Sequence, residues 1–149
     1  MSQHETTFPA KIRRWVGESA YQRGRRYVRE GRVLAPRRQD AWLKALCQGH
    51  AIEPYQVQVR LGGEEGILQA RCTCPAGSEG RCKHVAAVLI LWHTQPQAFR
   101  EAPPLREFLT QEDKDTLIAL ILRMVERHPD LAETIFLWAH EKKRGRDTP

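Results

Sequence analysis

Apolar residues recur at helical spacing near the N-terminus of the chain. Ile12, Trp15 and Val16 fall on one side of a short helix. Pro9 can open this helix, because proline is tolerated in a first helical turn, and Gly17 can end it. The pattern therefore predicts a short helical lead before a second amphipathic segment.

The second segment predicts a helix with two sharply different faces. Ser19 is its expected N-cap and Gly31 its expected C-terminal stop. At 100° per residue, one sector of the helix holds Tyr21, Gly24, Tyr27 and Val28. The opposite sector holds Arg23, Arg25, Arg26 and Arg29. One face is suited to packing, and the other meets either water or something anionic.

Beyond this helix the apolar period changes to two, which is typical of half-buried strands. Three strands are expected, and the last one stops at Pro75. Their inward positions, in chain order, are Ala41, Leu43, Ala45 and Cys47; Tyr55, Val57, Val59 and Leu61; and Leu68, Ala70, Cys72 and Cys74. A helix then begins near residues 82–84 and buries an apolar side that includes Val85, Val88, Leu89 and Trp92.

Helical spacing returns near the C-terminus. Residues such as Leu117, Ile121 and Met124 predict one helix, and Pro129 can open another. The expected fold is α+β, with N-terminal helices, a small antiparallel sheet, a metal-pinned strand-to-helix finger and a C-terminal helical pair. The expected segments are a lead (1–18), a finger module (19–93), a linker (94–104), a helical hairpin (105–143) and a disordered tail (144–149).

Candidate chemistry is concentrated where the last strand turns into its helix. Cys72, Cys74, Cys82 and His84 form the pattern C-x-C-x7-C-x-H. Structural zinc takes four thiolate or imidazole ligands at tetrahedral corners, and a strand end facing a helix start can supply two corners each. We therefore predict a complete Zn²⁺ site. Redox-active thiols or small core residues are the weaker alternatives, and Cys47 is expected in the core.

Charge and composition indicate the kind of protein and the cellular compartment. Residues 11–38 hold ten basic and two acidic residues, a formal charge of +8, whereas the rest of the chain carries −2. The longest apolar run is far too short for a membrane span, and the polar N-terminus does not look like a signal peptide. These features predict a soluble cytoplasmic protein with no membrane partner, whose cysteines are reduced.

The four ligand residues resemble the SWIM zinc finger, whose pattern is C-x-C, a variable gap and C-x-H. The similarity extends over residues 19–93, through the segments YQRGRRYVREGRV, AWLKALCQG, YQVQVRL and CKHVAA. It is greatest to bacterial SWIM proteins in which the finger stands alone, and residues 105–131 are similar to the helical extension that often follows the finger there. This resemblance implies zinc ligation by the four residues and a role in binding DNA or protein, without catalysis.

Two binding functions remain open. The arginine face predicts contact with nucleic acid, most simply DNA, through Arg23, Arg25, Arg26, Arg29 and Arg32. The alternative is a protein–protein adaptor for a separately encoded ATPase, such as a Swi/Snf-type helicase, because fingers of this family often accompany such enzymes. A solvated charged face is the plainer explanation of the arginines. An enzyme is not expected, since zinc would occupy the only reactive thiols.

Overall fold

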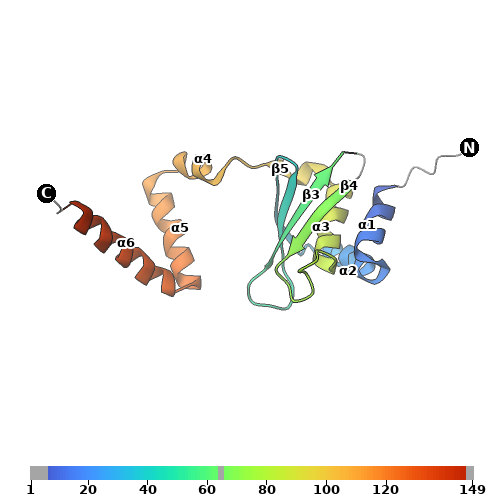
Figure 1. Ribbon diagram of the computed structural model, residues 1–149, viewed down its shortest axis with the longest axis horizontal. Helices are drawn as coiled ribbons and strands as arrows, with labels where there is room; N and C mark the ends of the chain where they lie inside the picture. The colour runs from blue at the N-terminus through green and yellow to red at the C-terminus, as the bar shows by residue number, and fades with distance from the viewer. Residues whose placement is uncertain (1–6, 64–65, 147–149) are drawn as a thin grey trace, which may run out of the picture. The chain divides into compact units, whose positions relative to one another are not determined.

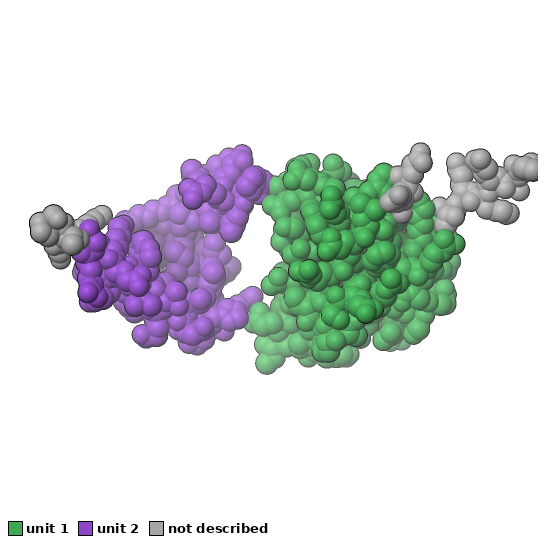
Figure 2. All heavy atoms as spheres, viewed as in Figure 1, with its two compact units in different colours: residues 1–102 green, residues 103–149 purple. Residues whose placement is uncertain are grey.

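The computed structural model describes residues 7–63 and 66–146, which form two compact units. One unit spans Met1–Ala102 and the other Pro103–Pro149 (Figure 2). The first contains the sheet, three α-helices and the cysteine cluster, and the second is helical.

The first unit is built on a mixed five-stranded sheet in the order β4-β3-β2-β1-β5. β1 to β4 pair antiparallel, and β5 adds to β1 in parallel (Figure 1). The strands are β1 (Val33–Gln39), β2 (Trp42–Cys47), β3 (Tyr55–Gly62), β4 (Gly66–Cys72) and β5 (Arg100–Glu101). The predicted α+β class and antiparallel core are confirmed, but two strands of this sheet were not predicted.

The two missed strands have weak local signals. In β1, Pro36 and two following arginines interrupt the alternation, and the register shifts between Leu34 and Arg37. Ala35 lies at this irregularity with φ 48°. β5 is only two residues long and falls inside the predicted linker, which also contains the 3₁₀ turn Pro96–Ala98. Two residues of the segment predicted as a linker thus pair with the edge of the sheet.

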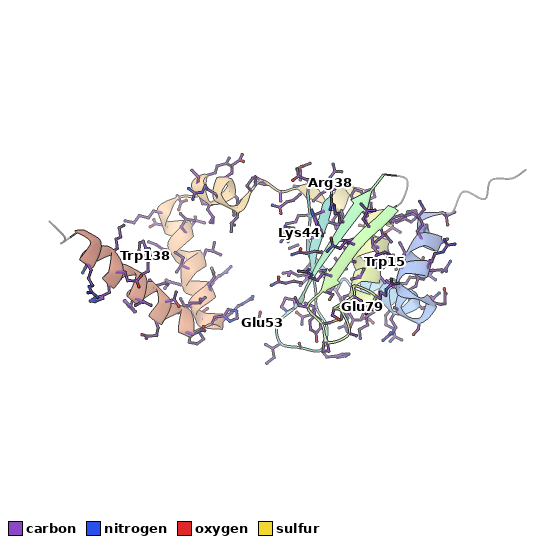
Figure 3. The ribbon with its side chains drawn as sticks, in the orientation of Figure 1. Trp15, Arg38, Lys44, Glu53, Glu79 and Trp138 are labelled. Atoms are coloured by element: carbon purple, nitrogen blue, oxygen red, sulfur yellow. The ribbon has the colours of Figure 1, made fainter. Side chains whose placement is uncertain are left out.

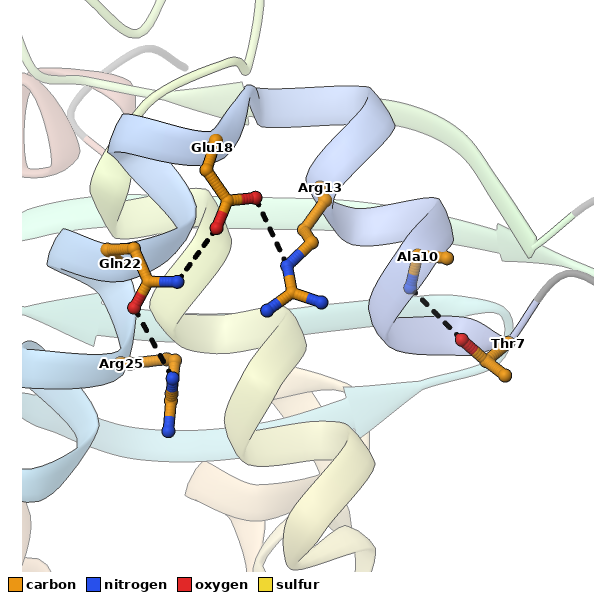
Figure 4. Close-up of polar contacts among 6 residues, drawn as sticks. All are labelled: Thr7, Ala10, Arg13, Glu18, Gln22 and Arg25. Carbon is orange, nitrogen blue, oxygen red and sulfur yellow. Dashed lines mark hydrogen bonds and ion pairs between the residues drawn. The ribbon is translucent and has the colours of Figure 1, made fainter.

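Two consecutive helices, α1 (Phe8–Val16) and α2 (Glu18–Arg29), precede the sheet. The Thr7 hydroxyl accepts a hydrogen bond from the Ala10 N–H at the start of α1, and Gly17, with φ 88°, separates the helices. The prediction of Ser19 as an N-cap was wrong, because α2 begins at Glu18. The Glu18 carboxylate instead contacts Arg13 across the junction at 3.2 Å (Figure 4).

The central helix of the first unit is α3 (Lys83–Thr94), which contacts β1 to β4 as well as α1 and α2. Every residue from His84 to Ile90 is buried, so this helix is covered on almost all sides. Gly24 of α2 lies against it, and a Cβ there would come within 2.6 Å of the Ala86 Cβ. The small residue thus permits close approach of two helices.

A bulge changes which residues of β4 face the core. Arg60 pairs with Gln69 whereas Leu61 pairs with Ile67, so Leu68 has no partner in the ladder. Leu68 is 42% exposed, and Ile67 is buried instead. The predicted inward position of Leu68 was wrong because one inserted residue shifts the two-residue alternation. The alternation resumes correctly at Ala70 and Cys72.

The second unit consists of α4 (Leu105–Thr110), α5 (Lys114–Arg127) and α6 (Asp130–Arg146). α5 and α6 correspond to the two predicted C-terminal helices, whereas α4 was not predicted. α6 continues through part of the predicted tail, of which residues 147–149 lie outside the described range. Across the described residues, no helix combines the length and apolar character that a membrane crossing needs.

Candidate metal centre

The end of β4 and the start of α3 bring the four predicted ligands together. Cys72 is the last residue of β4, Cys82 is the N-cap of α3, and Cys74 and His84 lie two residues beyond each. All four are buried, and their potential ligand atoms lie within 4.8 Å of one another. Such a cluster has the compactness that coordination of a single ion requires.

The loop between the ligand pairs is shaped by its own backbone. The Cys72 N–H donates to the Gly77 carbonyl at 3.1 Å, and the Gly77 N–H donates to the Cys74 carbonyl at 3.0 Å. A Cβ at Gly77 would lie 2.8 Å from the Cys74 sulfur. One at Gly80, where φ is 68°, would lie 2.2 Å from the Ala70 carbonyl oxygen. Glycine at both positions therefore allows the loop to fold tightly around the sulfurs.

Trp15 of α1 forms hydrogen bonds with residues of this loop. The Trp15 indole N–H donates to the Gly80 carbonyl at 2.9 Å, and the Arg81 guanidinium donates to the Trp15 carbonyl at 2.9 Å. The same guanidinium lies 5.0 Å from the Trp15 ring centroid. Figure 3 labels Trp15 on α1 and Glu79 on the loop. These contacts join residues 65 or more positions apart, and sequence reasoning missed them because no local pattern marks them.

The histidine of the cluster is enclosed by two tyrosines. Its Nδ1 lies 3.7 Å from the Cys72 sulfur, which places this nitrogen on the side of the thiols. Its ring centroid lies 5.3 Å from that of Tyr27 and 4.8 Å from that of Tyr55. Its Nε2 is buried without a hydrogen-bond partner in the described residues. The ring is thus oriented by packing, with one nitrogen available to a metal.

The thiols of the cluster cannot all ionise without a cation. The pKa of Cys82 is lowered to about 4, chiefly because its sulfur accepts a hydrogen bond from the Cys72 thiol. The same hydrogen bond and burial raise the pKa of Cys72, and burial raises that of Cys74. Without metal, the cluster therefore favours one thiolate and two thiols at neutral pH. A divalent cation that binds thiolates supplies the charge that the other two sulfurs lack.

The residues therefore fit Zn²⁺. Three sulfurs and one imidazole nitrogen are the donors of a closed structural zinc site, which leaves no coordination position for a reacting water. Three thiolates exceed the charge of the ion by one, and the neighbouring Arg71, Arg81 and Lys83 can offset this excess. When bound, zinc supplies a rigid link between a strand end and a helix start.

The fourth cysteine lies outside this set. Cys47 is fully buried on β2, and its thiol donates to the His84 carbonyl at 3.7 Å. Burial is the largest cause that raises its pKa to about 12. The thiol therefore stays protonated, and the prediction of a core role is confirmed.

These features define the class of the first unit as a structural zinc finger with a Cys3His donor set, built where a strand meets a helix. Residues 55–93 match the family model of the SWIM zinc finger, and the four clustered residues in this segment are positioned to hold Zn²⁺. The resemblance seen in the sequence is thereby confirmed for these residues. No curated protein and no solved structure matches the chain.

The five arginines that were predicted to contact nucleic acid differ in their exposure to solvent. Arg23, Arg25, Arg26 and Arg29 are all exposed on α2. Arg32 follows the helix and is only partly exposed, because its guanidinium pairs with Glu30 at 2.5 Å and lies 5.0 Å from the Tyr27 ring centroid. It also donates to the Gln48 carbonyl at 3.3 Å. Arg32 thus braces α2 against the sheet, whereas the other four point outward.

Proposed function

We propose that this protein binds nucleic acid, most simply DNA, through the outer face of α2, and that it has no catalytic activity of its own. The SWIM finger itself is a binding module. The supporting observation is a row of four exposed arginines, Arg23, Arg25, Arg26 and Arg29, with no carboxylate at ion-pair distance among the described residues. Such a row can neutralise several backbone phosphates at once.

The metal centre holds this arginine row in a fixed orientation. α2 packs along α3, and the Gly24 position permits the close contact between them. The N-cap and the first turn of α3 carry two of the four metal ligands, Cys82 and His84. Zinc thus stabilises the helix on which α2 rests. The finger acts in this proposal as a scaffold, and the arginines act as the contact.

Replacing Arg25, Arg26 and Arg29 together by glutamate should weaken binding to labelled duplex DNA by at least about a hundredfold at low salt. The reason is that the change removes three phosphate contacts and introduces three repulsive charges. Fluorescence anisotropy at two salt concentrations measures this effect. The slope of log K against log salt should also become shallower by about 0.9 for each lost contact.

A matched control reverses the same number of charges elsewhere. Arg106, Lys114 and Arg127 are exposed on α4 and α5, and their replacement by glutamate leaves α2 intact. The two triple variants have the same net charge, so a general loss of attraction would affect both equally. Equal affinities of the two variants would contradict a contact through α2.

The adaptor function is a second candidate, and one observation favours it. Many large apolar side chains of the second unit are exposed, namely Leu105, Phe108, Ile118, Leu120, Ile121, Leu122, Met124, Ile135, Phe136, Leu137 and Trp138. Trp138 is 59% exposed on α6 (Figure 3). Apolar surface on this scale is typical of a protein-binding region. In this proposal the helices dock a separately encoded ATPase of the Swi/Snf type.

Replacement of Phe136 and Trp138 by aspartate should abolish co-purification of such an ATPase from the native host, because both apolar anchors would be lost. Both residues are exposed, so the first unit should keep its zinc. The arginine-to-glutamate triple variant is the control and should retain the ATPase. A wild-type chain that elutes without an ATPase would contradict the adaptor function.

A further inference from the structure

The sheet of the first unit has two different faces. α3 packs on the face that carries Leu43, Ala45, Val57 and Val59, which are all buried. The alternate positions of β2 and β3 point to the other face, and their side chains are partly buried or exposed. Figure 3 shows Lys44, one of these residues, on the side of the sheet away from α3. Within the described part of the first unit no helix covers this side, which we call the open face.

The strand register assembles side chains of the open face into rows that cross the sheet. Residues directly opposite each other on neighbouring strands point to the same side. Lys44 pairs with Gln58 on β3 and with Arg37 on β1. Gln58 pairs in turn with Arg71 on β4, and Arg37 pairs with Arg100 on β5. One row therefore crosses all five strands, and all of its residues except Gln58 are cations.

A second row of the open face lies two residues along the strands and adds an aromatic side chain. Arg60 on β3 lies between Trp42 on β2 and Gln69 on β4. Arg60 and Gln69 are exposed, and Trp42 is partly exposed. An indole beside cations can stack on a base, and a glutamine amide can both donate to and accept from base edges. This row therefore offers groups that bind nucleobases as well as phosphates.

The charges that the described strands place on the open face are all positive. These strands contain one acidic residue, Glu101, which pairs with Arg38. Arg38 also pairs with the buried Leu43, so the Glu101 carboxylate belongs to the other face. No ion pair within the described residues includes a cation of the open face. These cations are Arg37, Lys44, Arg60, Arg71 and Arg100.

This arrangement of cations destabilises the sheet. Antiparallel sheets commonly expose one polar face to water, but like charges directly opposite each other on neighbouring strands are unfavourable. Lys44 lies opposite Arg37, and Arg37 lies opposite Arg100, so three cations follow one another across β2, β1 and β5. A face that met only water would be more stable with both signs interspersed. Local rules of this kind are broken chiefly at functional sites, and here the missing negative charge points to an anionic partner.

We infer that the open face of the sheet binds a single strand of nucleic acid. At a strand spacing of about 4.8 Å, the five-stranded row extends over about 19 Å, so several backbone phosphates can lie on its cations at once. Trp42 stacks on an unpaired base, which a duplex would keep within its own stack. The inference goes beyond the proposed function, because it concerns a second surface. α3 lies between the sheet and α2, so the open face and the arginine row of α2 are separate.

The substitution Lys44→Glu tests this inference with two opposite effects. The new carboxylate would lie opposite Arg37, so the thermal midpoint should rise by roughly 1–5 °C. Affinity of the zinc-loaded full chain for a labelled oligothymidylate of roughly 12 nucleotides should nevertheless fall about tenfold. Fluorescence anisotropy measures this fall, and the slope of log K against log salt should become shallower by about 0.7. Arg106→Glu, at an exposed position of α4, changes the net charge equally and is the control.

Trp42→Leu and duplex DNA form the second arm of the test. Trp42→Leu should weaken single-strand binding about tenfold without changing its salt dependence, because stacking releases no counterions, and should leave duplex binding unchanged. Single-strand affinities of the Lys44 and Trp42 variants that equal that of the Arg106 control would overturn the inference and leave the proposed function standing. Equal losses for duplex and single strand would also overturn it. Loss of single-strand binding in both variants, with duplex binding unaffected by the α2 triple variant, would support the inference and overturn the proposed function.

Discussion

Replacement of Cys82 by alanine will abolish zinc binding and destabilise the first unit by at least about 5 kcal/mol. The reason is that structural zinc sites contribute about 10–16 kcal/mol of apparent binding free energy, whereas a whole domain is stable by only about 5–15 kcal/mol. All four ligands are buried, so loss of the ion leaves polar groups without compensation. Zinc content by atomic absorption and chemical denaturation measure the two effects.

Cys47→Ala is the matched control for this experiment. Cys47 is also a buried cysteine, but it lies on β2 outside the ligand set. Its replacement should cost only about 1 kcal/mol, through the loss of one sulfur atom from the core, and should leave one zinc per chain. If Cys82→Ala retained zinc and matched the stability of Cys47→Ala, the structural role of the metal would be disproved.

Metal release should also depend steeply on pH. Cys82 has a lowered pKa and is already a thiolate at neutral pH, whereas Cys72 and Cys74 have raised pKa values. Zinc must therefore displace about two protons when it binds near neutral pH, and its affinity should fall about a hundredfold for each unit by which the pH is lowered. Stability that depends on zinc is thus present at neutral pH and is lost on acidification.

Gly24→Ala should destabilise the first unit by about 1–3 kcal/mol, even though alanine is the better helix former by about 1 kcal/mol. The new Cβ would lie 2.6 Å from the Ala86 Cβ and 2.9 Å from the Ala87 backbone nitrogen. Neither neighbour is a flexible side-chain end, so α2 must move away from α3. Thermal denaturation measures the effect, and DNA binding should weaken because the arginine row moves with the helix.

Gly145→Ala provides the control for this substitution. Gly145 also lies in a helix, but a Cβ there would meet no atom within 4 Å. The control variant should therefore be at least as stable as the wild type, because it gains only helix propensity. A similar gain at Gly24 would show that α2 and α3 are not packed as closely as described.

Much of the first unit was predictable, because it depends on residues that lie close together in the sequence. The wheel of α2 correctly assigned Tyr21 and Tyr27 to the core and the arginines to solvent, because helical spacing alone decides which residues share a face. The metal ligands were predictable for the same reason. Two short pairs, at a strand end and a helix start, need only one chain reversal to converge.

Features that depend on pairing between distant segments were not predictable. The bulge that exposes Leu68 arises from the register of β4 against β3, and β5 exists only because β1 offers it an edge. The Trp15 contact to the loop and the enclosure of His84 by two tyrosines join distant parts of the chain. A single sequence window contains no signal for such pairs, since their energy arises only after the segments meet.

The sequence by itself determined the α+β class, the four zinc ligands and the opposite faces of α2, because each depends on spacing within a few residues. Tertiary structure alone decided which arginines remain exposed and which one packs against the sheet. Arg32 differs from Arg29 by only three positions, yet it pairs with Glu30 and lies beside the Tyr27 ring, because the chain leaves the helix there and turns towards the sheet. The pocket lined by Cys74, Cys82 and His84 likewise exists only where α2, the metal loop and α3 converge, since no one of these segments encloses it alone.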